Sequence, residues 1–200
     1  VYGAIIIGNS CLIILLYGLQ SWVPTMLLRV YEWDLVQSGR VYGSIAMLAG
    51  SAGVLSGPFV LRYMSKINVN APHFKLAIIG ITMATFSLVL LPFQPNVNIA
   101  LVFVTMASFF VTLPLAGTSS AMVIVSPNRI RGVITGIYVV VTSVFGLVLG
   151  PFLVASSTDF IFQDTNAVAK SLALVSVLVG PVGIFFMFKG INSFGEIKNV

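Results

Sequence analysis

The most regular feature of the chain is the alternation of long uncharged apolar stretches with short charged windows. The stretches without Asp, Glu, Lys or Arg are residues 1–28, 41–61, 76–128, 132–158 and 171–188. A hydrocarbon core about 30 Å thick is crossed by about 20 apolar residues of helix, since each residue rises about 1.5 Å. Unpaired backbone amides are too costly in lipid for irregular chain to cross it. Each stretch is therefore long enough for one transmembrane helix, and 76–128 is long enough for two.

The longest stretch is divided by the segment Pro92-Phe-Gln-Pro-Asn-Val-Asn98. Its prolines fix φ and lack an amide donor, and its asparagines favour turns, so it predicts a tight turn outside the bilayer. The sequence therefore predicts an all-α integral membrane protein with six transmembrane helices. The expected spans are about 4–27, 41–61, 75–92, 98–124, 131–156 and 170–189.

Composition excludes an ordinary water-soluble domain. Hydrophobic residues make up 58% of the chain, charged residues only 8%, and the mean hydropathy is +1.07, whereas soluble domains are about 25% charged. The pI near 9.6 does not indicate nucleic-acid binding, because the basic residues are spread over short loops. A single cysteine, Cys11, excludes an intrachain disulfide, and no Cys/His spacing fits a metal. No uncharged stretch holds an Asp, Glu, His or Lys that could act as a base, so we expect no enzyme activity and no cofactor.

Charge predicts the orientation of the chain in the membrane, because cytoplasmic loops retain Lys and Arg during insertion. One face of the predicted bundle carries Arg29, Arg40 and Lys170 with Glu32, Asp34, Asp159 and Asp164. The other carries Arg62, Lys66, Lys75, Arg129, Arg131, Lys189 and Lys198 with the single acid Glu196. We therefore expect a multi-pass protein of the cell membrane, the cytoplasmic membrane if the source is bacterial, with both termini in the cytoplasm.

An internal repeat links the second and fifth predicted helices. Gly53-Val-Leu-Ser-Gly-Pro-Phe-Val60 matches Gly146-Leu-Val-Leu-Gly-Pro-Phe-Leu153 at an offset of 93 residues. The offset spans three helices, and an odd number of crossings inverts the second copy in the membrane. The pattern predicts two inverted three-helix repeats, which are typical of secondary transporters.

Glycines form a small-residue face on both matched helices. The candidate packing and gating positions are Gly53, Gly57, Gly146 and Gly150. Small residues let helix backbones approach closely in lipid, so the simplest interpretation is ordinary helix packing. A second hypothesis is that these smooth faces let the helices slide or rock during transport. Pro24 and Pro114 lie in apolar helices, where each predicts a static bend or a hinge.

Polar side chains at lipid depth indicate which helix faces are turned toward protein or water. Stripes of this kind occur on the first, fourth and fifth predicted helices, and the third and sixth lack them and are expected to face lipid. The candidate cavity residues are Asn9, Tyr17, Gln20, Thr112 and Thr142. For the threonines, a hydrogen bond to the carbonyl four residues back is the alternative.

Several motifs resemble the C-terminal half of a major facilitator superfamily transporter, and most closely the spinster-like group. They are Gly18-Leu-Gln-Ser-Trp-Val-Pro-Thr25, Val125-Ser-Pro-Asn-Arg-Ile-Arg-Gly132, and Gly150-Pro-Phe152 followed by Thr158-Asp159. The resemblance implies twelve helices in two halves around a central cavity, so the partner would be an N-terminal six-helix half. It also implies that the first and fourth helices line the cavity and that the second and fifth meet the other half. Gly57-Pro-Phe-Val-Leu-Arg62 departs from the family pattern by lacking its acidic residue.

The expected function is secondary transport of an amphiphilic, lipid-like or small organic solute, within membrane lipid and with the second half as partner. The chain begins at Val1 rather than Met, which indicates a piece of a longer polypeptide. Spinster-like proteins are associated with lysolipid and sphingolipid export, while related carriers take organic anions such as sugar acids. A receptor or scaffold that binds without transporting, and a channel formed by oligomers, also stay open.

Overall fold

The computed structural model describes residues 2–198, and the side chains of residues 2–192. The chain folds into α1 (Tyr2–Val30), α2 (Leu35–Ile45), a π-helical segment (Ala46–Gly50), α3 (Ser51–Lys66), α4 (Pro72–Leu90), a 3-10 turn (Leu91–Phe93), α5 (Val97–Thr112), α6 (Leu115–Val125), α7 (Arg131–Ser156), a second π-helical segment (Ser157–Phe162) and α8 (Val168–Lys198). Val1 and the side chains of Glu196 and Lys198, which entered the analysis of sequence and charge, lie outside the described part.

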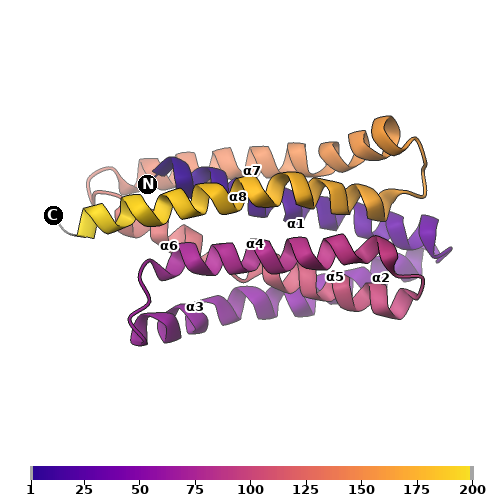
Figure 1. Ribbon diagram of the computed structural model, residues 1–200, viewed down its shortest axis with the longest axis horizontal. Coiled ribbons are helices and arrows are strands. Elements are labelled where there is room, and N and C mark those ends of the chain that lie inside the picture. Colours follow the sequence, from indigo (N-terminus) through magenta and orange to yellow (C-terminus); the bar gives the residue numbers. More distant parts are fainter. Residues whose placement is uncertain (1, 199–200) are drawn as a thin grey trace.

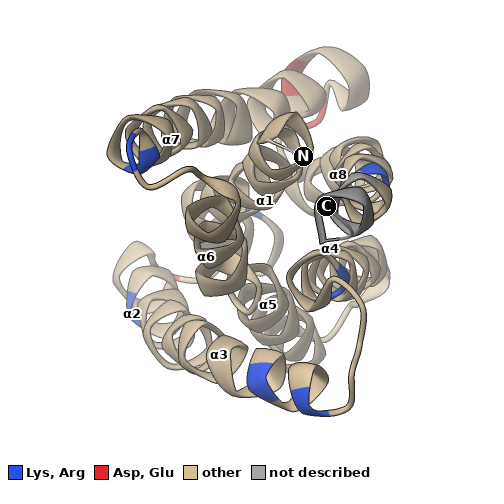
Figure 2. Cartoon of the chain, turned by 90° about the vertical axis from the view of Figure 1, so that its left-hand side faces the viewer, with Lys and Arg blue, Asp and Glu red and all other residues tan. Residues whose placement is uncertain are grey.

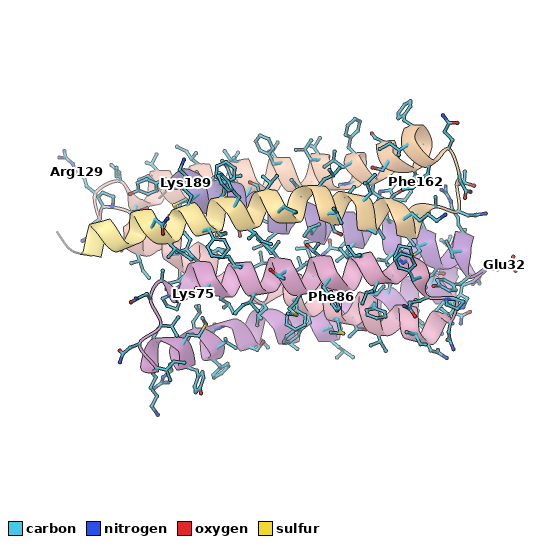
Figure 3. The ribbon with its side chains drawn as sticks, viewed as in Figure 1. Glu32, Lys75, Phe86, Arg129, Phe162 and Lys189 are labelled. Carbon is cyan, nitrogen blue, oxygen red and sulfur yellow. The ribbon has the colours of Figure 1, made fainter. Side chains whose placement is uncertain are left out.

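These elements form six helices that are long and apolar enough to cross a membrane, in agreement with the predicted all-α fold. We call them the first to sixth spans: Tyr2–Val30, Leu35–Lys66, Pro72–Phe93, Val97–Val125, Arg131–Phe162 and Val168–Asn192. Figure 1 shows them running side by side along one axis, with both chain ends at the same end of the bundle. Figure 3 shows Lys75, Arg129 and Lys189 at that end and Glu32 at the opposite one.

Several spans extend further than the charge pattern predicts, the second and fifth among them. The second begins at Leu35 and not near residue 41, and the fifth ends at Phe162 and not near 156. The carboxylate of Asp34 accepts a hydrogen bond of 3.1 Å from the Val36 amide, which caps the helix before the uncharged stretch begins. The prediction was too short because charged residues end the apolar stretch, while the helix itself continues through the headgroup layer.

The packing of the spans has the symmetry of an inverted repeat. The first span packs mainly against the fifth and sixth, the fourth packs mainly against the second and third, and the third packs against the sixth. Exchanging the first with the fourth, the second with the fifth and the third with the sixth leaves this pattern unchanged. In the end-on view of Figure 2, α6 lies between α7 above and α2 and α3 below, and α4 and α8 lie to its right.

Glycines of the second span touch the fourth. A Cβ atom added at Gly53 would meet the Thr112 side chain and would lie 2.5 Å from the Phe109 carbonyl oxygen. A Cβ atom at Gly57 would meet the Leu113 carbonyl oxygen. Only a residue without a side chain lets the two backbones approach this closely.

The equivalent glycines of the fifth span touch the first. A Cβ atom at Gly146 would meet the side chain of Ile13. At Gly150 it would lie 2.7 Å from the Ile14 carbonyl oxygen and 3.0 Å from the Gly18 amide nitrogen. These contacts are the counterpart of those that Gly53 makes, so the structure supports the repeat through its packing as well as its sequence.

The repeat extends to a second pair of glycines, which are differently placed. Gly39 and Gly43 stand 93 residues before Gly132 and Gly136, and a Cβ atom added at any of the four would meet nothing within 4 Å. The glycine face of each helix is thus divided between a packed part and an exposed part. The packed glycines contact helices of this unit, as the simplest interpretation, ordinary helix packing, expects.

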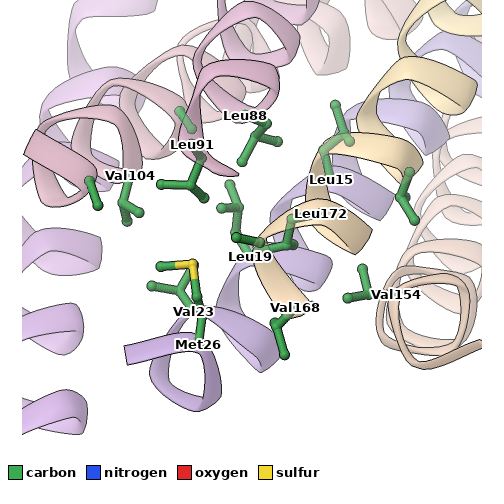
Figure 4. Packing of buried hydrophobic residues seen from close by; sticks show 14 of the residues in the cluster. Leu15, Leu19, Val23, Met26, Leu88, Leu91, Val104, Val154, Val168 and Leu172 are labelled. Carbon is green, nitrogen blue, oxygen red and sulfur yellow. The ribbon is translucent and has the colours of Figure 1, made fainter. Parts of the chain in front are cut away.

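The apolar core lies around the first span. Figure 4 shows Leu15, Leu19, Val23 and Met26 of α1 among buried side chains of α4, α5, α7 and α8. Two longer-range hydrogen bonds tie the C-terminal part of α1 and the residue that follows it to neighbours: Trp22 Nε1 donates to the Pro151 carbonyl at 3.0 Å and the Tyr31 hydroxyl donates to the Gln94 carbonyl at 2.7 Å. Burial raises the pKa of the Tyr31 phenol, which keeps it protonated as a donor.

We predict that Gly150→Ala destabilises the fold by about 1–3 kcal/mol, because the added methyl group overlaps backbone atoms that cannot move aside. Gly136→Ala in the same helix is the matched control, and it should be neutral or stabilising by up to about 1 kcal/mol through helix propensity. Thermal unfolding in detergent, followed by a dye that reacts with the buried Cys11 thiol once it is exposed, measures both. Equal melting temperatures for the two variants would contradict the close packing of Gly150 against α1.

Candidate functional site

A cavity of about 480 Å³ lies between the first, second and fourth spans. Its lining consists of Leu16, Gln20, Tyr42, Ala46, Gly50, Ser51, Val54, Leu55, Ser108, Thr112 and Leu115. Ligand pockets in proteins commonly have volumes of about 300–1,000 Å³. The cavity is therefore large enough for a small organic molecule or for part of a larger one.

The cavity lies near the middle of all three spans that form it. Leu16 is at the centre of Tyr2–Val30, Ser51 is at the centre of Leu35–Lys66, and Thr112 is next to the centre of Val97–Val125. Since each of these helices crosses the whole bilayer, their midpoints lie near the bilayer midplane. Solute sites of transporters built from repeats are found at this depth.

Two interruptions of regular helix meet at the cavity. In the second span, the π-helical segment Ala46–Gly50 contributes its first and last residues to the lining. In the fourth, α5 ends at Thr112 and α6 begins at Leu115, and both residues line the cavity. Irregular backbone at lipid depth is tolerated only where protein or a cavity surrounds it, and single π turns are frequent at functional sites.

Pro114 explains the interruption of the fourth span. Proline has no amide hydrogen, and its ring clashes with the carbonyl of the residue four positions earlier, so it favours a break or bend in the helix, and here α5 ends just before it. The helix restarts at once, with the Thr118 amide donating to the Pro114 carbonyl at 2.9 Å. Pro24, the other predicted bend, lies inside the continuous helix α1.

The polar groups of the lining are neutral. They belong to Gln20, Tyr42, Ser51, Ser108 and Thr112, and the lining contains no Asp, Glu, Lys, Arg or His among the described residues. The Thr112 hydroxyl donates to the Ser108 and Phe109 carbonyls, at 2.9 and 3.0 Å, so it is already satisfied by its own helix.

Ser108 differs from Thr112 because its hydroxyl is not satisfied. The residue is only 4% exposed, and within the described part of the chain its Oγ atom has no hydrogen-bond partner. The phenol of Tyr42 lies beside the Ser108 hydroxyl. The two groups do not form a hydrogen bond of ordinary geometry. A buried hydroxyl without a partner costs free energy, so Ser108 is the lining residue with the most to gain from a ligand.

Comparison with known proteins adds the fold relationship. The sequence matches no protein-family model and no curated protein. Among solved structures, the chain is similar to a bacterial homologue of the human lysosomal transporter Spinster in its inward-facing, unoccupied conformation, with a TM-score of 0.78 and 14% sequence identity over 98% of this chain and 48% of that one. For the inward-facing, occupied conformation the TM-score is 0.65, with 14% identity over 96% of this chain and 47% of that one.

This chain has the fold of about half of that bacterial Spinster homologue. The predicted six-helix fold is thereby confirmed, and the chain spans about half the length of the solved structures it matches. Because the sequence identity is only 14%, the comparison shows a common fold and does not identify a solute.

The structure brings two of the five predicted cavity residues together. Gln20 and Thr112 both line the cavity, whereas Asn9, Tyr17 and Thr142 do not. Tyr17 is half-buried, and its Cβ lies next to Gly150 of the fifth span. Thr142 is buried and donates to the Tyr138 carbonyl at 2.8 Å, which is the local hydrogen bond named above as the alternative for threonines.

Asn9 takes part in a buried polar contact instead. It is 2% exposed, and its Oδ1 atom accepts a hydrogen bond of 2.7 Å from the Thr118 hydroxyl. The neighbouring Ser119 hydroxyl lies 3.4 Å from that of Tyr138. These contacts link the first, fourth and fifth spans in the interior of the bundle. Asn9 therefore does not line the described cavity, and its amide is satisfied by another helix instead.

Tyr42, Ser51 and Ser108 are the polar lining residues that the candidate list missed. Ser108 belongs to the polar stripe of the fourth span, so a signal for it was present. Tyr42 and Ser51 carry no such signal, because they are brought to the cavity by the π-helical segment between them.

We predict that Thr118→Val lowers stability by about 0.6–2 kcal/mol, since it leaves the Asn9 oxygen without its donor inside an apolar bundle. Thr118→Ser retains the hydroxyl and is the control, with a melting temperature close to that of the unmodified protein. Adding Asn9→Ala to each variant completes a double-mutant cycle. If Asn9→Ala lowers stability by the same amount with Val as with Thr at position 118, the two side chains are not coupled and the assigned hydrogen bond is wrong.

Proposed function

We propose that this chain is one six-helix half of a secondary membrane transporter and that the cavity forms part of its solute site. The observation that carries the proposal is the coincidence, near the bilayer midplane, of a cavity with both interruptions of regular helix. Discontinuous helices at this depth form the solute sites of secondary transporters. The likeness in fold to an inward-facing transporter supports the same conclusion. The chain would move its solute by alternating access and without covalent chemistry.

The partner in this proposal is a second six-helix half, which would cover the side of the second and fifth spans. These two are the least covered, with 28% of their apolar window buried against 56% for the first span. Their exposed glycines lie at opposite ends of the bundle, Gly39 and Gly43 toward the Glu32 end and Gly132 and Gly136 toward the Arg129 end. Such positions suit two halves that close alternately at the two membrane faces.

We further propose that the protein lies in the cell membrane with the Lys- and Arg-rich end of the bundle in the cytoplasm. Figure 2 views the bundle from this end, where α3, α4, α7 and α8 carry basic residues. The acidic residues that the picture colours lie at the far end. This asymmetry supports cytoplasmic termini, because positive loops resist translocation.

Accessibility of single cysteines tests the transport proposal without a known solute. We use the full-length protein in sealed vesicles with Cys11→Ala as background and a membrane-impermeant thiol reagent. Gln20→Cys should be labelled when the reagent is added from either side, because alternating access opens the cavity to each face in turn. Lys66→Cys and Trp33→Cys report sidedness, and we expect cytoplasmic labelling for the first and external labelling for the second.

Met83→Cys on the exposed surface of α4 is the matched negative control, since it faces lipid in this proposal. Labelling of Gln20→Cys from one side only, under all conditions, would instead indicate a receptor or scaffold with a one-sided pocket. Equal labelling of Gln20→Cys and Met83→Cys would show that the cavity is not a distinct aqueous site.

A further inference from the structure

We propose that the cavity binds an uncharged hydrogen-bonding group, a hydroxyl or an amide, carried on an apolar body. This inference rests on the proposed function, because it names the class of solute held by the same site. The sequence leaves two classes of solute open, amphiphiles and organic anions, and this inference favours the amphiphiles.

The first argument is the charge of the lining. None of the described lining residues is ionisable near neutral pH, since the only titratable side chain is the phenol of Tyr42. An ionised group moved from water into a low-dielectric cavity needs an opposite charge to offset its lost hydration. The part of the site that this chain supplies offers no such charge, so this wall does not itself favour carboxylates, phosphates or ammonium groups.

The second argument is the kind of hydrogen bond on offer. The Ser108 residue is only 4% exposed, and its hydroxyl makes no hydrogen bond of ordinary geometry in the described structure, although the Tyr42 phenol lies beside it. The Gln20 side chain, which is exposed at the cavity, carries both an NH₂ donor and a carbonyl acceptor. Groups that both donate and accept are complementary to neutral groups that do the same, such as hydroxyls and amides.

The third argument is the remainder of the lining, which is apolar. Leu16, Val54, Leu55 and Leu115 surround the polar groups with aliphatic surface. A fully polar solute such as a free sugar would leave hydroxyl groups facing these side chains without partners. An amphiphile places its apolar part there instead, with its single polar end at Ser108 and Gln20.

The experiment measures equilibrium binding to the full-length protein in lipid nanodiscs, with empty nanodiscs correcting for partition into lipid. The probes are 1-decanoylglycerol as the neutral amphiphile, decanoate as the anion and decyltrimethylammonium as the cation. We expect saturable binding of 1-decanoylglycerol and binding at least tenfold weaker for the two charged probes. Ser108→Ala and Gln20→Leu should each weaken the neutral probe by about three- to tenfold, the effect of one hydrogen bond.

Thr105→Val is the matched control on α5. Its hydroxyl donates to the Leu101 carbonyl at 2.7 Å and lies outside the lining, so binding should be unchanged. Gln20→Lys provides an independent readout, because a cation placed in the cavity should raise the affinity for decanoate above that of the unmodified protein. Melting curves for each variant separate lost binding from lost folding.

The inference would be overturned if decanoate or decyltrimethylammonium bound more tightly than 1-decanoylglycerol and if Ser108→Ala weakened the binding of that charged probe. It would also be overturned by neutral binding that neither Ser108→Ala nor Gln20→Leu changes, because the probe would then occupy another site. Binding as expected in a protein whose Gln20→Cys variant is labelled from one side only would overturn the proposed transport and leave the ligand class standing.

Discussion

A polypeptide in lipid must satisfy every backbone N–H and C=O group within itself, and the rest of this structure depends on that constraint. It explains why the uncharged stretches form six helices and why nearly all irregular backbone lies at their ends. The exceptions at mid-membrane are the π-helical segment Ala46–Gly50 and the break between Thr112 and Leu115. Both occur where the first, second and fourth spans enclose a cavity. The interruptions are therefore informative, because a helix exposed to lipid on all sides could not carry them.

Close packing by glycine provides the second constraint. Lipid tails are as apolar as the helices, so helices associate through contact and hydrogen bonds and not through exclusion of water. Gly53 and Gly57 meet the fourth span, and Gly146 and Gly150 meet the first, at equivalent places in the two repeats.

The sequence predicts most of the fold because most of it depends on local properties. Span number follows from charge and length, and the turn at Pro92–Asn98 follows from proline and asparagine. The glycine repeat could have been extended, since Gly39 and Gly43 have the same offset to Gly132 and Gly136 as the packed pairs. The break at Thr112–Leu115 could also be anticipated from Pro114, whereas no residue marks the π-helical segment Ala46–Gly50.

The site was harder to predict because it depends on which helices become neighbours. Helical periodicity places Asn9 and Gln20 on similar faces, but Asn9 meets Thr118, 109 residues away, while Gln20 meets the cavity. Polar stripes identify the interior side of a helix and do not distinguish a hydrogen bond to another helix from a wall of a cavity. For Ser108 and Thr112, one turn apart, the difference is whether the hydroxyl is satisfied by its own backbone. That difference is visible only in the folded protein.

The central claim is that water and solute reach the helix interruptions at mid-membrane, and amide hydrogen exchange of the full-length protein in nanodiscs tests it directly. We expect faster exchange for amides of residues 46–52 and 112–117 than for residues 78–88 in the uninterrupted helix α4 at the same depth. Exchange of all three segments at the same slow rate would contradict the account, because it would show a dry, closed bundle at the place where we assign the site.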